Sequence, residues 1–267
     1  MFGLTQRHLA MAASDVRAGM FDWRLWNLLA WQDIKQRYRR STLGPLWLTI
    51  STAIQMLVMG TLGSFLFATD YDRYLPYICA GIIFWSMMTN IITDGANAFV
   101  NSSSHLTQVR RPLTTFLMQV VWRNTIVLAH NFIIFAVVAL IFRVTPGASI
   151  FLWPLGLAVV IACVAWMALV AGVIAARFRD IPMIITSLIN VLFWLTPLMY
   201  FPEQLGRRQY IIEYNPFTHL LALVRAPLLG QTPSLENWLV ALAFAICGWA
   251  ATFLFFARFR SRIVYWL

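Results

Sequence analysis

The sequence predicts an all-α integral membrane protein that crosses the bilayer six times, and three observations predict this fold. Of its 267 residues, 60% are hydrophobic and only 11% are charged, whereas a soluble domain carries about 25% charged residues. The chain also contains six charge-free runs of 19 to 33 residues, and about 20 apolar residues are enough for a helix to cross the hydrocarbon core. Finally, its basic residues gather in alternate loops, as in multi-pass membrane proteins.

Each charge-free run is predicted to form one transmembrane helix. The longest run ends at Ala176 and is too short to cross twice with a turn, because Pro146, Gly147 and Pro154 shorten its start. With one crossing for each run, the sequence predicts six spans. Their predicted boundaries are residues 44–67, 75–93, 114–142, 151–176, 181–200 and 237–257.

The distribution of charge predicts the orientation. Fifteen of the 20 Lys and Arg residues lie on the side of the N-terminus and five on the opposite side, whereas the ten acidic residues divide equally. Since positive charge collects in cytoplasmic loops, both termini are predicted to be cytoplasmic. The net charge of +10 then faces anionic lipid headgroups and predicts no nucleic-acid partner.

The segment before the first span is predicted to be an interfacial helix over residues 17–40. Trp23, Trp26 and Trp31 alternate there with Arg and Asp residues. Tryptophan prefers the headgroup region, which places such a helix in the plane of the cytoplasmic membrane surface. A merely solvated amphipathic segment is the alternative.

Residues 97–112 form a polar loop between the second and third predicted spans. The span that follows extends to Phe142, and its length of about 45 Å exceeds what the bilayer core requires. The extra turns are therefore predicted to project into the cytoplasm. Composition alone leaves open whether this loop is a plain connector or a docking surface.

The outer segment between the last two spans, residues 201–236, contains an apolar stretch over 217–229. That stretch is about 20 Å long as a helix, too short to span and too apolar to lie in water. Asn215 and Pro216 before it are typical of a helix N-cap and first turn. We expect a short re-entrant helix at the mouth of a pathway; a helix resting on the outer membrane surface is the alternative.

The sequence offers little support for an enzyme. The predicted spans contain no Asp or Glu, and the polar pair His130 and Asn131 is typical of a hydrogen bond between helices. The three cysteines lie in separate apolar runs without the spacing of metal ligands. The only lysine, Lys35, lies outside any phosphate-binding loop. We therefore predict no cofactor or metal in this chain; if ATP drives transport, a separate subunit binds the ATP and Mg²⁺.

Three stretches of the sequence carry distinctive motifs. The basic segment Arg37–Trp47 reads RYRRSTLGPLW, Arg179-Asp180-Ile181 forms the turn into the fifth predicted span, and Leu195-Thr196-Pro197 lies near the end of that span. Tyr214–Leu220 reads YNPFTHL. Together these stretches resemble one family, the permease subunits of ABC-2-type exporters of O-antigen, capsule or teichoic acid, at its entry into the first span, at both ends of its fifth span and at the start of its outer gate.

The resemblance implies a homodimer of six-span half-transporters that binds two copies of a separate ATPase and carries its cargo between the protomers. It implies coupling to the ATPase through the loop 97–112 and the preceding helix, at Trp23, Trp26, Asn101, Ser104, His105, Gln108, Arg110 and Arg111. It implies an outer gate at Asn215, Pro216, Phe217 and His219. Aromatic rings suit sugars, so the candidate pathway residues are Phe65, Phe67, Tyr74, Tyr77, Phe193, Trp194 and Tyr200.

The function expected from these observations is ATP-driven export of a polysaccharide, in a lipid-linked form, across the bacterial inner membrane. Two alternatives stay open at this point. One is an ABC-2 exporter of a small lipid or drug with the same architecture. The other is a membrane enzyme acting on a lipid-linked sugar, which the missing acid–base pair disfavours.

Overall fold

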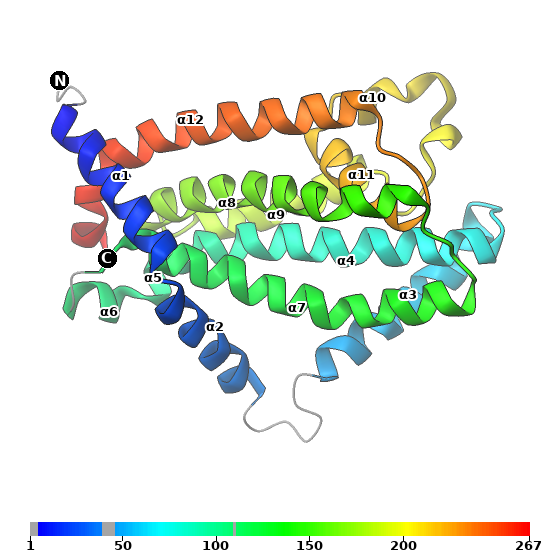
Figure 1. Cartoon of the computed structure of the whole chain (residues 1–267), viewed down its shortest axis with the longest axis horizontal. Helices are drawn as coiled ribbons and strands as arrows, with labels where there is room; N and C mark the ends of the chain where they lie inside the picture. Colours follow the sequence, from blue (N-terminus) through cyan, green and yellow to red (C-terminus); the bar gives the residue numbers. More distant parts are fainter. Residues whose placement is uncertain (1–4, 39–45, 109–110) are drawn as a thin grey trace.

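Long helices run side by side along one axis in a computed structural model that describes residues 5–38, 46–108 and 111–267 (Figure 1). The first and the last described helices begin and end, respectively, at the same end of the bundle; this is the end that the charge distribution predicts to be cytoplasmic, and we refer to it as the cytoplasmic end and to the opposite one as the outer end. The helices are α1 (Gln6–Phe21), α2 (Trp23–Tyr38), α3 (Leu46–Leu66), α4 (Tyr71–Ala96), α5 (Ala98–Asn101), α6 (Ser103–Gln108), α7 (Leu113–Ile141), η1 (Ala148–Leu152), α8 (Trp153–Arg177), α9 (Ile181–Leu195), η2 (Pro202–Arg208), α10 (Tyr210–Glu213), α11 (Pro216–Leu228) and α12 (Leu235–Trp266).

Five helices among the described residues are long and apolar enough to cross a membrane. They are α3, α4, α7, α8 with its preceding turn η1, and α12, and they correspond to five of the six predicted spans. The chain is thus a multi-pass membrane protein. The start of the first predicted span, residues 44 and 45, lies outside the described residues.

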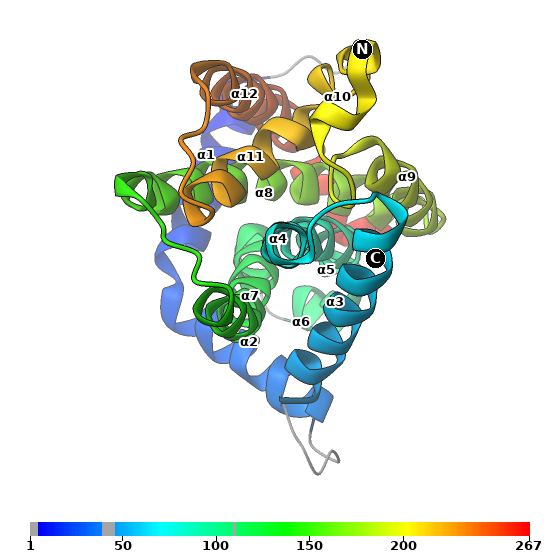
Figure 2. The same ribbon diagram turned by 90° about the vertical axis from the view of Figure 1, so that its right-hand side faces the viewer.

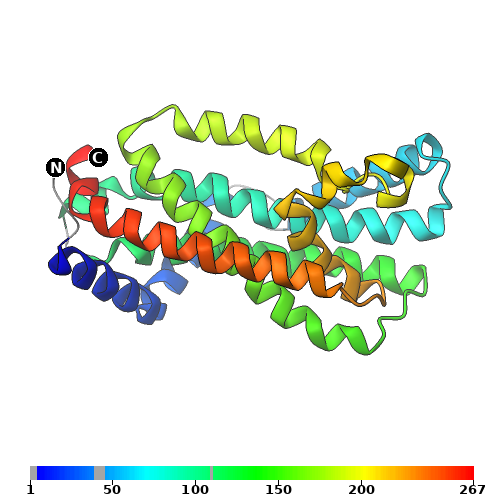
Figure 3. The ribbon, with the colours of Figure 1, turned by 90° about the horizontal axis from the view of Figure 1, so that it is seen from above.

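The fifth predicted span, residues 181–200, is shorter than expected. Its helix α9 ends at Leu195 after 15 residues, about 22 Å of rise, and falls short of the roughly 30 Å hydrocarbon core. Thr196 has extended backbone angles because the proline after it disfavours the helical conformation. The chain then continues without helix to Phe201. Helix α9 runs along one flank of the bundle (Figure 3).

The predicted interfacial helix over residues 17–40 is two helices rather than one. Helix α1 ends at Phe21 and α2 begins at Trp23, with a break at Asp22. Helix α1 begins earlier than predicted because it packs against α7 and α12, contacts that the local sequence does not reveal. Trp23 and Leu28 of α2 are exposed, which suits a helix lying at the membrane surface.

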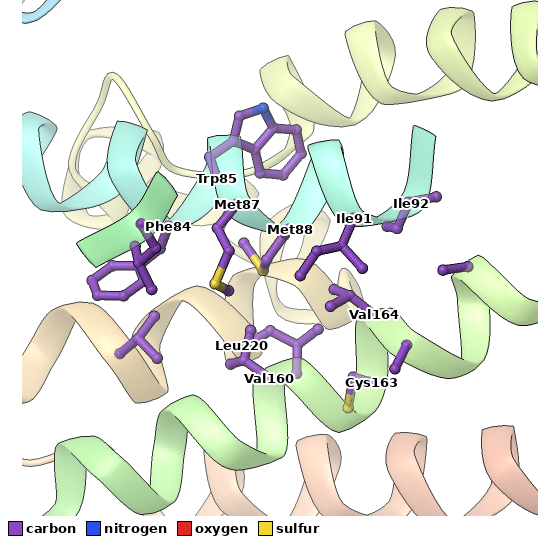
Figure 4. Packing of buried hydrophobic residues seen from close by; sticks show 14 of the residues in the cluster. Phe84, Trp85, Met87, Met88, Ile91, Ile92, Val160, Cys163, Val164 and Leu220 are labelled. Carbon is purple, nitrogen blue, oxygen red and sulfur yellow. The ribbon is translucent and has the colours of Figure 1, made fainter. Parts of the chain in front are cut away.

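The core is built around α4, which lies in the middle of the bundle (Figure 2). Its side chains are buried on nearly every face, as expected for a helix that is apolar all round. Phe84, Met88 and Ile91 are almost fully buried and pack toward α8 and α11 (Figure 4). Small residues allow the close approach: a Cβ atom on Gly172 would lie 2.8 Å from the Gly95 carbonyl oxygen.

Helix α11 is held inside the bundle by contacts with α4, α8 and α12. It begins as the sequence predicts, with the Asn215 side chain accepting a hydrogen bond from the Phe217 N–H and Pro216 in the first turn. Most of its residues are buried. This burial favours a helix that re-enters the bundle over one that rests on the outer surface.

Candidate functional site

At the cytoplasmic end, the predicted coupling loop 97–112 contains the two short helices α5 and α6. They stay attached to the bundle through Phe99 and Leu106, whose side chains are buried. The predicted coupling residues are exposed at Asn101, Ser104, His105, Gln108 and Arg111, while Arg110 lies outside the described residues. Exposure at this end is what a docking surface requires.

The two predicted coupling tryptophans differ in their surroundings. Trp23 is exposed, whereas the ring of Trp26 lies edge-on against Trp122 of α7, with the centroids 5.6 Å apart. The Trp122 indole N–H donates to the Asn27 side chain at 2.7 Å. Trp26 therefore attaches α2 to the bundle, and Trp23 is the one available for a partner.

A polar pocket of about 580 Å³ lies between α2, the coupling loop and α7. At its wall Arg123 of α7 binds Asp33 of α2 at 2.6 Å and Asp94 of α4 at 2.8 Å. Asn101 and His105, two of the predicted coupling residues, line the same pocket. The double ion pair fixes the interfacial helix against the two spans that flank the coupling loop.

Asp15 of α1 joins three parts of the cytoplasmic end. Its carboxylate accepts hydrogen bonds from the backbone N–H groups of Leu113 and Thr114. These donors lie at the start of α7, where they have no acceptor within the helix itself. It also accepts from the Arg260 guanidinium of α12, with the closest nitrogen at 2.7 Å. The Asp15 side chain is fully buried. The end of the coupling loop is therefore held between the first helix and the last.

At the outer end, side chains of α4, of α11 and of Asn215 directly before α11 bind carbonyl groups at the end of α9 and in the non-helical segment 196–201. The Tyr74 hydroxyl donates to the Met199 carbonyl at 2.6 Å, and the single Tyr77 O–H lies within hydrogen-bond distance of the carbonyls of both Pro197 and Tyr200. The Arg225 guanidinium also donates to the Pro197 carbonyl, and the Asn215 side-chain amide donates to the Leu195 carbonyl. Backbone without helix is tolerated at membrane depth only when such partners replace water.

Four side chains form a column beside this segment. The Arg225 guanidinium lies 3.9 Å from the ring centroid of Tyr77, and Arg73 lies 4.9 Å from that of Phe201. The two rings pack together at 4.3 Å. Burial lowers the pKa of Arg225 from its ordinary value, while Tyr77 and Glu203 act in the opposite direction. The guanidinium nevertheless stays charged, so the column carries a fixed positive charge at each end.

The predicted gate residues Asn215, Pro216, Phe217 and His219 all lie at the start of α11. The ring nitrogens of His219 hydrogen-bond with the Glu213 carbonyl oxygen at 2.7 Å and the Asn237 side chain at 2.8 Å. Phe217 packs edge-on against Trp85 of α4. The start of α11 is therefore tied to α4, α10 and α12 at once.

The predicted pathway aromatics fall into two groups. Phe65 and Trp194 are exposed on α3 and α9, and Phe67, Phe193 and Tyr200 are partly exposed. Tyr74 and Tyr77 are buried, and their hydroxyls are engaged by backbone carbonyls. The structure thus gives these two tyrosines a role in holding the non-helical segment, while a pathway role of the other five stays a prediction.

Sequence reasoning missed the roles of Asp15, Asp33 and Arg225. Arg225 was counted with the outer loop charges, although its side chain is only 7% exposed. Its position inside the apolar stretch 217–229 was the available signal. Among the described residues, no group of three or more His, Cys, Asp or Glu side chains is placed to hold a metal ion.

The long apolar helices define a multi-pass, all-helical membrane protein. A family model described as ABC-2 type transporter matches residues 24–229. The chain belongs to this family, as a transport subunit without an ATPase domain. The family implies an ATPase partner subunit.

Three relatives resemble the chain over most of its length, and each is an O-antigen export system permease protein RfbA. The protein from Myxococcus xanthus is 23% identical, with 86% of this chain and 90% of the relative covered. Two proteins from Klebsiella pneumoniae are 18% and 17% identical, with 77% and 71% of this chain and 80% and 74% of the relatives covered.

Proposed function

We propose that this chain is the membrane-spanning permease of an ATP-driven polysaccharide exporter in the bacterial inner membrane. Its cargo is a lipid-linked polymer such as O-antigen or capsule. The observation that carries the proposal is the similarity to O-antigen export permeases along nearly the full length of both chains. ATP and Mg²⁺ are bound by two copies of a separate ATPase subunit.

The surface on α3 and α9 supports a second copy of the chain as the other half of the transporter. Both helices lie on the same flank of the bundle (Figure 2), and α9 has no buried residue in the single chain. Met183, Leu188 and Trp194 are exposed on α9 together with polar side chains such as Asn190. A dimer through this flank places polar groups and aromatic rings along one shared pathway.

The aromatic side chains on that flank fit a saccharide cargo. A sugar ring presents polarised C–H groups to the negative face of an aromatic ring, and such contacts need no fixed register. Phe65 and Trp194 are exposed near the outer end, with Phe193 beside Trp194 at 5.5 Å. A sugar chain can move past these rings one unit at a time.

The decisive experiment is depletion of this protein in its own host, followed by localisation of each surface polysaccharide. If this chain exports a polysaccharide, one polymer disappears from the surface and accumulates on the cytoplasmic side. If all surface polymers are unchanged, polysaccharide export is rejected and export of a small lipid or drug becomes the better hypothesis.

The coupling loop provides a prediction of its own. Reversing the charge at Arg110 and Arg111 is expected to leave ATP hydrolysis at its basal rate and to lower export at least about tenfold, because charge pairs orient docking surfaces. Hydrolysis and export are measured together in proteoliposomes that contain both subunits. Arg258→Glu, an exposed charge at the same end, is the control. Export that stays coupled to hydrolysis in the double variant contradicts the assignment.

A further inference from the structure

The outer end of the chain contains a pocket of about 510 Å³ to which the proposed transport function assigns no role. Its walls come from the start of α4, the Phe201–Glu203 segment, α11 and the loop before α12. This volume lies within the range of about 300–1,000 Å³ typical of small-molecule sites. The pocket lies at the end of the bundle where an exported molecule emerges.

Four charged side chains line this pocket, two of each sign: Asp72, Arg73, Glu203 and Arg225. The ion pairs found within the described residues join Arg123 and Arg260 to other carboxylates, so none of them joins two of these four. Arg225 is only 7% exposed. Its contacts with the Pro197 carbonyl and the Tyr77 ring fix its position. The four charges therefore line one space without an ion pair between any two of them, and Arg225 has a fixed place in it.

The balance of charge and surface indicates the class of ligand. The two carboxylates repel a phosphate, and the two guanidinium groups repel a cation. The amide side chains of Gln231 and Asn237 add donors and acceptors, while Pro76 and Leu229 supply apolar wall. A neutral ligand with many hydroxyl groups and an apolar C–H surface satisfies all of these groups, because planar carboxylate, guanidinium and amide groups pair with neighbouring hydroxyls.

We propose that this pocket binds glycosyl units of the polymer after they have crossed the membrane. The inference rests on the proposed function and adds a site on the outer face, separate from the aromatic rings on α3 and α9. The faces of Tyr77 and Phe201 are occupied by the guanidinium groups and by each other, so recognition is through polar edges. A sugar unit bound here opposes backward movement of the chain.

The test uses full-length permease in nanodiscs and labelled oligosaccharides prepared from the surface polymer of the host. Equilibrium dialysis is expected to show saturable binding that Glu203→Ala and Asp72→Ala each weaken about tenfold, the usual effect of losing a hydrogen bond to a charged group. Both side chains are exposed at the rim. Glu213→Ala, an exposed outer carboxylate absent from the pocket lining, is the matched control and retains full affinity.

Two results overturn the inference. One is an absence of saturable binding to the wild-type chain, and the other is binding that both rim variants leave unchanged while they fold as the control does. Equal binding of maltohexaose supports a site that accepts glycosyl units of any sequence. Because depletion in the host tests export independently, a polymer that is lost from the surface but does not bind here rejects this site alone.

Discussion

Replacing Arg225 by methionine is expected to lower ATP-dependent export at least about tenfold while the chain still inserts and dimerises. The variant removes one donor to the Pro197 carbonyl and the contact with the Tyr77 ring. A lost hydrogen bond from a charged donor costs about 1.5–3 kcal/mol. Methionine is long and apolar, so it fills the site without leaving an unpaired charge. The non-helical segment 196–201 is then less firmly held, although the Tyr77 hydroxyl can still donate to the Pro197 carbonyl.

Two further variants make this prediction specific. Arg225→Lys keeps the charge but not the planar fork, so partial export is expected. Arg207→Met, an exposed outer position in η2, is expected to behave as wild type. Export is measured as the rate at which the polymer reaches the surface, with the amount of membrane-inserted dimer determined in parallel. Wild-type export by Arg225→Met contradicts the role assigned to this side chain.

The second large effect is expected at Asp15. Replacing this buried carboxylate by alanine leaves the Leu113 and Thr114 N–H groups and the Arg260 guanidinium without their acceptor. Removing one partner of a buried charge pair costs about 3–5 kcal/mol. We therefore expect the detergent-solubilised protein to unfold at a clearly lower temperature and to lose export as the coupling loop becomes detached.

The cysteines provide the measurement. Cys79 and Cys163 are buried whereas Cys247 is exposed, so in a Cys247→Ser background a thiol-reactive fluorescent dye reports unfolding once the two buried thiols become accessible. Arg260→Met is expected to have a smaller effect because the backbone N–H groups of α7 still bind Asp15. Asp180→Asn, an exposed carboxylate at the same end, is the control. An Asp15→Ala protein that unfolds at the wild-type temperature refutes the role of Asp15 in joining the three helices.

The sequence predicted those parts of the fold that depend on local patterns. Charge-free runs located five long helices, and Asn215 with Pro216 located the start of α11. The end of α9 at Leu195 was missed because an apolar run does not distinguish a helix from irregular backbone bound by side chains. The tyrosines that stabilise this segment come from α4, 120 or more residues earlier.

The candidate sites were predictable in location but not in detail. The loop 97–112 and the start of α11 stood out by composition, whereas Asp15 did not, because its partners lie 98 and 245 residues away in the chain. Arg225 was counted as an outer charge for the same reason: its burial depends on Tyr77 and Pro197, which come from other elements. Contacts between distant segments decide which charged residues are structural.

Helix α12 has a mechanical consequence for the exporter. It is an unbroken helix of 32 residues, about 48 Å long, with Arg260 bound to Asp15 near one end and Asn237 bound to His219 of α11 near the other. Because a continuous helix resists stretching, α12 is a rigid connection between the cytoplasmic and the outer end of the bundle. If the chain exports its cargo as proposed, we expect a displacement at the cytoplasmic end of α12 to reach the start of α11 along this single rigid helix.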